Sequence, residues 1–267
     1  MRADMVQAIL ATHKHIYGLG LMCVSLFLLL PVWTSYSNPG SSGWHFDAVG
    51  VSSFRNLRKF TLRAEDDDGF ADMGEIRTVL DRNEHTLRRL ILGAYLARDH
   101  SWDSAFESVT IKNLTHLDLV DTRISHFVLT RIAHARNLQS LTLHGTFEEP
   151  NSASILFASD HIIDGQHTFL PLLESFRFVV VGHDDEFALY KSVIQFLRKR
   201  ERLRRLDLGS CPWDLVLIIL PELKNLRVLG ALIGNLTQPS VSALVESLPK
   251  QMVAINLATS VSAAPLV

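Results

Sequence analysis

LRRLDL, which runs from Leu203 to Leu208, places its leucines in the pattern L-x-x-L-x-L. In an extended strand, side chains alternate between the two faces, so the second and third leucines point to one face and the residues between them to the other. The pattern therefore predicts a strand with one buried face. The same pattern, with Phe allowed in place of Leu, recurs as LRKFTL from Leu57, LRRLIL from Leu87, LTHLDL from Leu114, LQSLTL from Leu138 and LESFRF from Leu173, and in weaker form as LRVLGA from Leu226 and MVAINL from Met252.

Successive copies of this pattern begin between 23 and 35 residues apart. Leucine-rich repeats have periods of roughly 20 to 29 residues, and each repeat supplies one short strand and one helix or helical turn. Parallel stacking of such units makes a curved sheet with helices on its convex side. The sequence therefore predicts an α/β leucine-rich-repeat solenoid with irregular repeats.

The segments between the copies carry helical patterns that support this prediction. We expect helices in FALYKSVIQFLRKR, in PSVSALVESL and in SHFVLTRIAHAR, the last with Ser125 as its N-cap. The residues expected on the buried faces are Phe187, Tyr190, Val193, Ile194 and Leu197 in the first, Val241, Leu244, Val245 and Leu248 in the second, and Leu129, Ile132 and Ala133 in the third.

From Phe54 to Leu257 the chain resembles the leucine-rich-repeat region of fungal F-box proteins, although it shows no segment that resembles an F-box. In such families the ninth repeat position often holds Cys, Asn or Thr, whose side chain satisfies backbone groups after the strand. Thr122 in LTHLDLVDT and Cys211 in LRRLDLGSC match that position and are expected to be structural. The resemblance implies substrate recognition for a ubiquitin ligase, with cullin-ligase components among the partners, in the cytoplasm or nucleus.

The N-terminal run IYGLGLMCVSLFLLLPVWT, from Ile16 to Thr34, contains no charged residue and allows three interpretations. Ile16, Leu19 and Leu21 fit the repeat, which predicts a strand beside the one that starts near Leu57. A run of this length could instead be a signal anchor of a single-pass membrane protein, or part of a signal peptide, and either would make the chain a membrane-anchored or secreted receptor-like leucine-rich-repeat protein. We therefore divide the chain into residues 1–34 as an N-terminal repeat or anchor, 35–53 as a loop or insertion, and 54–267 as the repeat domain.

Motifs that carry chemistry are missing from the sequence. The twelve histidines form no H-E-x-x-H pattern, the cysteines no C-x-x-C pair, and the acidic run Glu65–Asp68 lacks the further ligands of a calcium loop. There is also no phosphate-binding loop and no hydrolase elbow. We therefore predict no catalytic residue, metal or cofactor; the alternative is an enzyme without a recognisable motif, whose catalytic residues would come together only in the folded chain. The formal net charge of -2 gives no overall reason to expect nucleic acid as a partner.

What remains is the solvent-facing side of the predicted sheet, which a solenoid would align into a continuous concave surface. Five of its charged residues are basic and two acidic, which favours an acidic or phosphorylated protein segment as the partner. The membrane becomes a partner only if Ile16–Thr34 is an anchor. The predicted binding residues are Lys59, Arg63, Arg89, His116, Asp118, His144, Arg177, Arg205 and Asp207.

Overall fold

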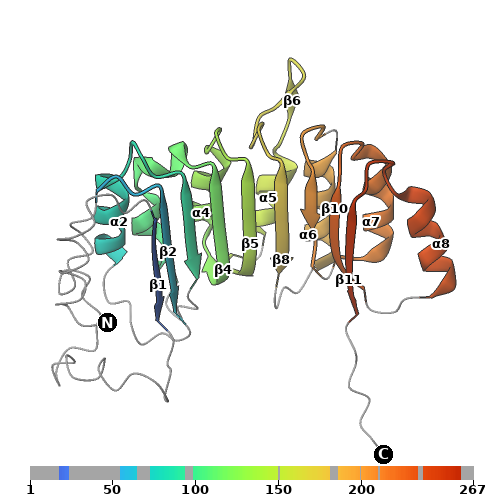
Figure 1. Cartoon of the computed structure of the whole chain (residues 1–267), viewed down its shortest axis with the longest axis horizontal. Coiled ribbons are helices and arrows are strands. Elements are labelled where there is room, and N and C mark those ends of the chain that lie inside the picture. The colour runs from blue at the N-terminus through green and yellow to red at the C-terminus, as the bar shows by residue number, and fades with distance from the viewer. Residues whose placement is uncertain are drawn as a thin grey trace, which may run out of the picture.

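The computed structural model describes residues 18–23, 55–64, 73–93, 99–149, 151–180, 186–198, 200–209, 211–233 and 237–259. Within them, nine strands form one parallel sheet in which chain order is also spatial order, interrupted only by a small separate hairpin. Figure 1 shows these strands side by side along an arc, with the helices on the far, convex side. The predicted leucine-rich-repeat solenoid is confirmed.

The elements follow the order in which the sequence alternates between strands and helices. The strands of the main sheet are β1 (Gly18–Cys23), β2 (Lys59–Ala64), β3 (Arg89–Gly93), β4 (His116–Ile124), β5 (Ser140–Phe147), β8 (Ser175–Val180), β9 (Arg205–Asp207), β10 (Val228–Ile233) and β11 (Ala254–Thr259). The helices are α2 (Met73–Arg82), α3 (Asp103–Phe106), η4 (Val109–Asn113), α4 (His126–Ala133), α5 (Ser152–Ala158), α6 (Glu186–Leu197), α7 (Trp213–Ile219), η5 (Leu220–Glu222) and α8 (Gln238–Ser247).

The core is built from the apolar positions of the repeated pattern. The middle position stacks across consecutive strands as a row of side chains that are at most 1% exposed: Phe60, Leu90, Leu117, Leu141, Phe176, Leu206 and Leu229. Full burial of such a side chain contributes about 1.5–3 kcal/mol relative to exposure. The repeat is therefore maintained by a continuous apolar stack between the sheet and the helices.

A backbone ladder marks the point at which each strand begins. The carbonyl oxygen of Arg58 accepts hydrogen bonds from the backbone N–H groups of both Arg88 and Arg89, each at 3.0 Å. The carbonyl of Arg88 does the same for the next repeat, and equivalent pairs of bonds continue as far as β11. This ladder places corresponding residues of successive repeats next to one another along one edge of the sheet, which we call the leading edge.

The N-terminal strand β1 pairs in parallel with β2 and places Leu19 opposite Phe60 and Leu21 opposite Leu62. A strand therefore lies where the repeat predicts it, shifted two residues toward the C-terminus. The other residues of the 1–34 segment, the 35–53 segment and the acidic run Glu65–Asp68 lie outside the described residues. Among the helices that the structure describes, none combines the length and apolarity required to cross a membrane.

The predicted helices are found, with two errors in their buried faces. Ser125 caps α4 by accepting a hydrogen bond from the Val128 N–H at 3.2 Å, as predicted. Phe187 of α6 was predicted to be buried but is 57% exposed. It lies at the edge of the helix face on which the other apolar residues of α6 are buried. Val245 of α8 is 63% exposed, since α8 is the last described helix and no later one covers its outer flank.

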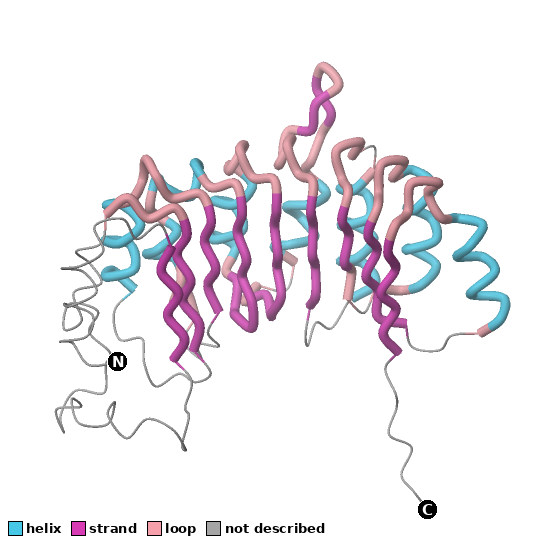
Figure 2. The backbone as a smooth tube through the Cα atoms, in the orientation of Figure 1, coloured by secondary structure: helices cyan, strands magenta, loops and turns pink. Residues whose placement is uncertain are grey.

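The longest interval between repeats contains a hairpin, β6 (Ile162–Ile163) and β7 (Gln166–His167), which projects beyond the leading edge (Figure 2). Its base is held by a buried ion pair between Asp160 and Arg200, with Oδ2 and Nη2 separated by 2.9 Å. Arg200 also donates hydrogen bonds to the carbonyls of Phe196 at 2.8 Å and Leu170 at 2.8 Å. The hairpin is thus an insertion that is fixed to the solenoid by a buried polar network.

Candidate binding surface

The nine predicted binding residues lie on the helix-free, concave face of the sheet, at alternate strand positions. Strand register aligns them in rows across neighbouring repeats, and we use "concave face" for these positions. The first row contains Lys59, Arg89, His116 and Arg205. The second contains Asp118, Arg177 and Asp207, and the third contains Arg63 and His144.

Three arginines of the concave face are already paired with carboxylates on other strands, two on the adjacent strand and one two strands away. Arg89 Nη2 lies 3.4 Å from Asp118 Oδ2, and Arg177 Nε lies 3.3 Å from Asp207 Oδ2. Arg63 Nη2 lies 3.2 Å from Asp121 Oδ2. Such partly exposed pairs contribute little to stability, but they reduce the positive charge that the face presents to a partner.

Asp121 is a residue that the sequence pattern does not identify. It adopts a φ of 53° beside a bulge between Val120 and Thr122, and its Oδ1 also lies 3.6 Å from His144 Nδ1. The left-handed conformation takes Asp121 out of strand alternation, so the L-x-x-L-x-L pattern gives no signal for its position. With this third carboxylate, the concave face is less positive than the sequence indicates.

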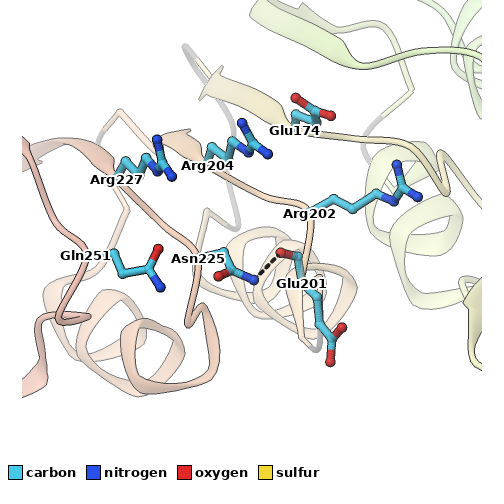
Figure 3. Close-up of a pocket in the computed structure, with 7 residues that line it drawn as sticks. All are labelled: Glu174, Glu201, Arg202, Arg204, Asn225, Arg227 and Gln251. Carbon is cyan, nitrogen blue, oxygen red and sulfur yellow. Dashed lines mark hydrogen bonds between the residues drawn. The ribbon is translucent and has the colours of Figure 1, made fainter.

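Next to the concave face, the leading edge between β8 and β11 forms a depression of about 380 Å³. Figure 3 shows Arg227, Arg204 and Glu174 in one row across it, with Gln251, Asn225 and Arg202 in a second row. Residues of the first row directly follow the first apolar residue of the repeat, and those of the second row directly precede it. We call this cavity the edge depression; its lining residues are Glu174, Glu201, Arg202, Arg204, Asn225, Arg227 and Gln251.

Asn225 helps to form this edge by donating a hydrogen bond from Nδ2 to the Glu201 carbonyl at 2.8 Å. Asn113 and Asn137 occupy the same repeat position and donate to the carbonyls of Glu84 at 3.5 Å and Lys112 at 3.3 Å. An Asn directly before the first leucine recurs in the sequence, but the motif alone does not show which group its side chain binds. These amides connect each repeat with the preceding one.

The two residues expected to be structural are both buried. Thr122 is fully buried, and its hydroxyl donates to the Arg123 carbonyl at 3.3 Å. Cys211 is 5% exposed, with Sγ 3.7 Å from the Pro212 carbonyl oxygen. Burial raises the pKa of the Cys211 thiol to about 12, which keeps it protonated at neutral pH and unsuited to nucleophilic chemistry.

At the opposite edge of the sheet, the structure brings together His100, Glu148 and Glu149, whose potential metal-ligand atoms lie within 4.8 Å of one another. The sequence gives no signal for this group, because His100 lies 48 residues before Glu148 and only the fold brings it next to the Glu148–Glu149 pair. Glu148 accepts a hydrogen bond from the His100 backbone N–H at 3.0 Å, and Glu149 accepts one from the His126 N–H at 2.8 Å. These bonds already give both carboxylates a structural role in connecting loops.

Comparison with known proteins adds one structural likeness. No protein-family model and no curated protein sequence matches the chain. Among solved structures, it is similar to the crystal structure of an internalin from Listeria monocytogenes, with 13% identity over 97% of this chain and 89% of the other, at a TM-score of 0.38. The assignment to the leucine-rich-repeat fold therefore rests on the repeats and the sheet of this chain itself.

Proposed function

We propose that the protein is a protein-interaction scaffold that binds its partner on the concave face. The observation that supports this most directly is the strand register, which aligns solvent-facing side chains of successive repeats on a surface that no described helix covers. Because the strands are ordered on folding, a partner meets a rigid platform and little backbone entropy is lost on binding.

Charge reversal on this face is the test of the scaffold role. Arg89, Arg177 and Arg205 project from three different strands, and Arg205 makes no ion pair with any residue that the structure describes. Replacing all three by Glu should abolish capture of an acidic partner in a quantitative pull-down. A matched control replaces three exposed residues of the helices or loops, Lys112, Arg136 and Lys191, by Glu, which makes the same change in net charge. Equal loss in both variants, or unchanged capture in the first, would contradict the proposal.

A narrower role is substrate recognition in a ubiquitin ligase, which the resemblance to F-box-associated repeats suggests. Its test is whether the intact protein recovers cullin-ligase components from cell extract. Recovery should survive the concave-face variant, because adapter subunits and substrates would use different surfaces. Failure to recover any ligase component would remove this narrower role and leave the scaffold proposal standing.

The division of the chain belongs to the same proposal. Residues 1–34 form a further repeat whose strand β1 extends the sheet, 35–53 form an insertion, and the main array occupies 54–267. The parallel pairing of β1 with β2 supports this arrangement. Deleting residues 1–34 should therefore expose the edge of β2 and accelerate amide hydrogen exchange at Thr61 and Arg63, whose backbone groups alternate toward β1, whereas an anchor that is independent of the repeats would leave that exchange unchanged.

A further inference from the structure

Arg204 and Arg227 lie beside each other at the leading edge, and neither forms an ion pair with a carboxylate of the described residues, although Glu174 and Glu201 line the same depression. The Arg227 N–H donates to the Arg204 carbonyl at 2.8 Å, which fixes the two residues at the starts of adjacent strands. Adjacent strands are roughly 4.8 Å apart, and like charges at neighbouring positions are unfavourable. The fold alone gives no reason to place two guanidinium groups there.

The same repeat position elsewhere in the chain shows how such an arginine can be satisfied. Arg88 donates from Nη1 to the Leu87 carbonyl at 2.8 Å and from Nη2 to the His85 carbonyl at 2.9 Å. Arg204 and Arg227, in contrast, make no side-chain hydrogen bond or ion pair with the described part of the chain. Their ten N–H donor positions are therefore directed to solvent, at a depression that Arg202 also lines.

We propose that the edge depression binds the phosphate group of a phosphoserine or phosphothreonine in a partner protein, with Arg204 and Arg227 as its principal ligands. This inference rests on the proposed scaffold function and names the chemistry of its partner. A planar guanidinium offers parallel N–H groups that match two phosphate oxygens, and such charge-assisted bonds are about twice as strong as neutral ones. Two arginines on adjacent repeats can thus hold one dianion from two sides.

The remaining lining residues favour a single phosphate on a protein segment over a nucleic acid strand. Glu174 and Glu201 line the same depression, where a repeating polyanion would meet repulsion but a basic residue beside the phosphate would be attracted. The amide of Gln251 forms no hydrogen bond within the described chain and can bond to the backbone of a bound segment. The volume of about 380 Å³ leaves room for residues beside the phosphate.

The test compares two pools of degenerate peptides, one with a central phosphoserine and the other with unmodified serine, by fluorescence polarisation against the full-length protein. The phosphorylated pool should bind at least tenfold more tightly. The double variant Arg204→Gln with Arg227→Gln should lose that preference, whereas Arg136→Gln, which removes an exposed arginine of a different repeat near the same edge, should retain affinity within twofold. Circular dichroism melts should be the same for all three proteins.

Three results would overturn the inference: equal binding of the two pools, an unchanged preference in the double variant, and tighter binding of a single-stranded oligonucleotide than of the phosphorylated pool. Failure here is distinguishable from failure of the scaffold proposal. If Arg204 and Arg227 are dispensable for partner capture while charge reversal at Arg89, Arg177 and Arg205 abolishes it, the scaffold function stands and the phosphate site falls.

Discussion

Gly145 in β5 faces the backbone carbonyl of Thr122 in β4 so closely that a Cβ on Gly145 would lie 1.8 Å from the carbonyl oxygen. The contact occurs directly after the bulge in β4, where Thr122 pairs with Gly145 across the two strands. The atom that would clash belongs to the backbone, so a change of rotamer cannot relieve the contact. The bulge and the glycine therefore depend on each other.

Replacement of Gly145 by Ala should lower the free energy of unfolding by about 3 kcal/mol, since one of the two strands must move. Urea denaturation followed by circular dichroism measures this loss. Gly165, at the tip of the β6–β7 hairpin, has a φ of 76°, and a Cβ added to it would meet no atom within 4 Å. Gly165→Ala should therefore cost only the left-handed strain, about 1 kcal/mol. Equal losses at the two positions would contradict the proposed clash.

The sequence pattern predicts most of this fold because the apolar positions of the motif are also the strand positions that face the core. A leucine at the second and third motif positions must point inward, so the strands and their stacking can be read from the chain, including β1. Features set by local backbone geometry or by the ends of the array were not predictable in this way. Asp121 leaves the pattern at a bulge, and Val245 is exposed because α8 lacks an outer neighbour.

The candidate site was predicted only in part for a related reason. Alternation identifies which residues face solvent, and all nine predicted residues do share one face. It does not show which arginine finds an acidic partner. Arg89 and Arg177 are paired by cross-strand neighbours, whereas Arg204 and Arg227 gain their environment from turns whose geometry the motif does not encode.

The Asp160–Arg200 pair should make the protein sensitive to acid. Burial, the largest influence, would raise the pKa of Asp160, but hydrogen bonds from His167 and the Phe169 N–H and the charge of Arg200 together outweigh it and hold the pKa below its usual value. A lowered folded-state pKa gives stability that is present above the unfolded-state pKa of roughly 3.9 and is lost as pH falls through the folded-state value.

Asp160→Asn should therefore destabilise the protein by about 3 kcal/mol at pH 7, because Arg200 would remain buried without a counter-charge. The difference from the wild type should shrink as the pH falls below about 4, where the Asp160 carboxyl of the unfolded chain begins to take up a proton that the folded protein does not bind. Denaturant titrations between pH 2 and pH 7 measure both effects. A difference that stays constant over this range would show that the charge of Asp160 contributes nothing to the pair.

Glu148 should show the opposite dependence on pH. Burial, only partly offset by the hydrogen bond from the His100 N–H, raises the pKa of its carboxyl. Ionised Glu148 therefore disfavours the folded state at pH values above its folded-state pKa, and protonation removes this cost as pH falls through that value. Glu148→Gln keeps an acceptor for the His100 N–H without the charge, so at pH 7 it should leave stability unchanged or raise it by up to about 1 kcal/mol.

A carbon-detected NMR titration of the Glu148 carboxyl should give a midpoint above that of an unperturbed Glu, and a midpoint below it would contradict this prediction.

Asn83 should be the most important single amide for the connection between the first repeats of the main array. It is 2% exposed, its Oδ1 accepts a hydrogen bond from the Leu57 N–H at 2.9 Å, and its Nδ2 donates to the Val79 carbonyl at 2.8 Å. Asn83→Ala would leave both backbone groups without that partner in a dry environment, which should cost about 2–3 kcal/mol. Asn83→Asp should also destabilise the protein, because the Val79 carbonyl would face a carboxylate that cannot donate.

The matched control is Asn151, an exposed residue at the start of α5 whose side chain makes no capping bond, so Asn151→Ala should change the free energy of unfolding by less than about 0.5 kcal/mol. If the two alanine variants unfold at the same denaturant concentration, the bridge from Asn83 to Leu57 does not stabilise the start of the array.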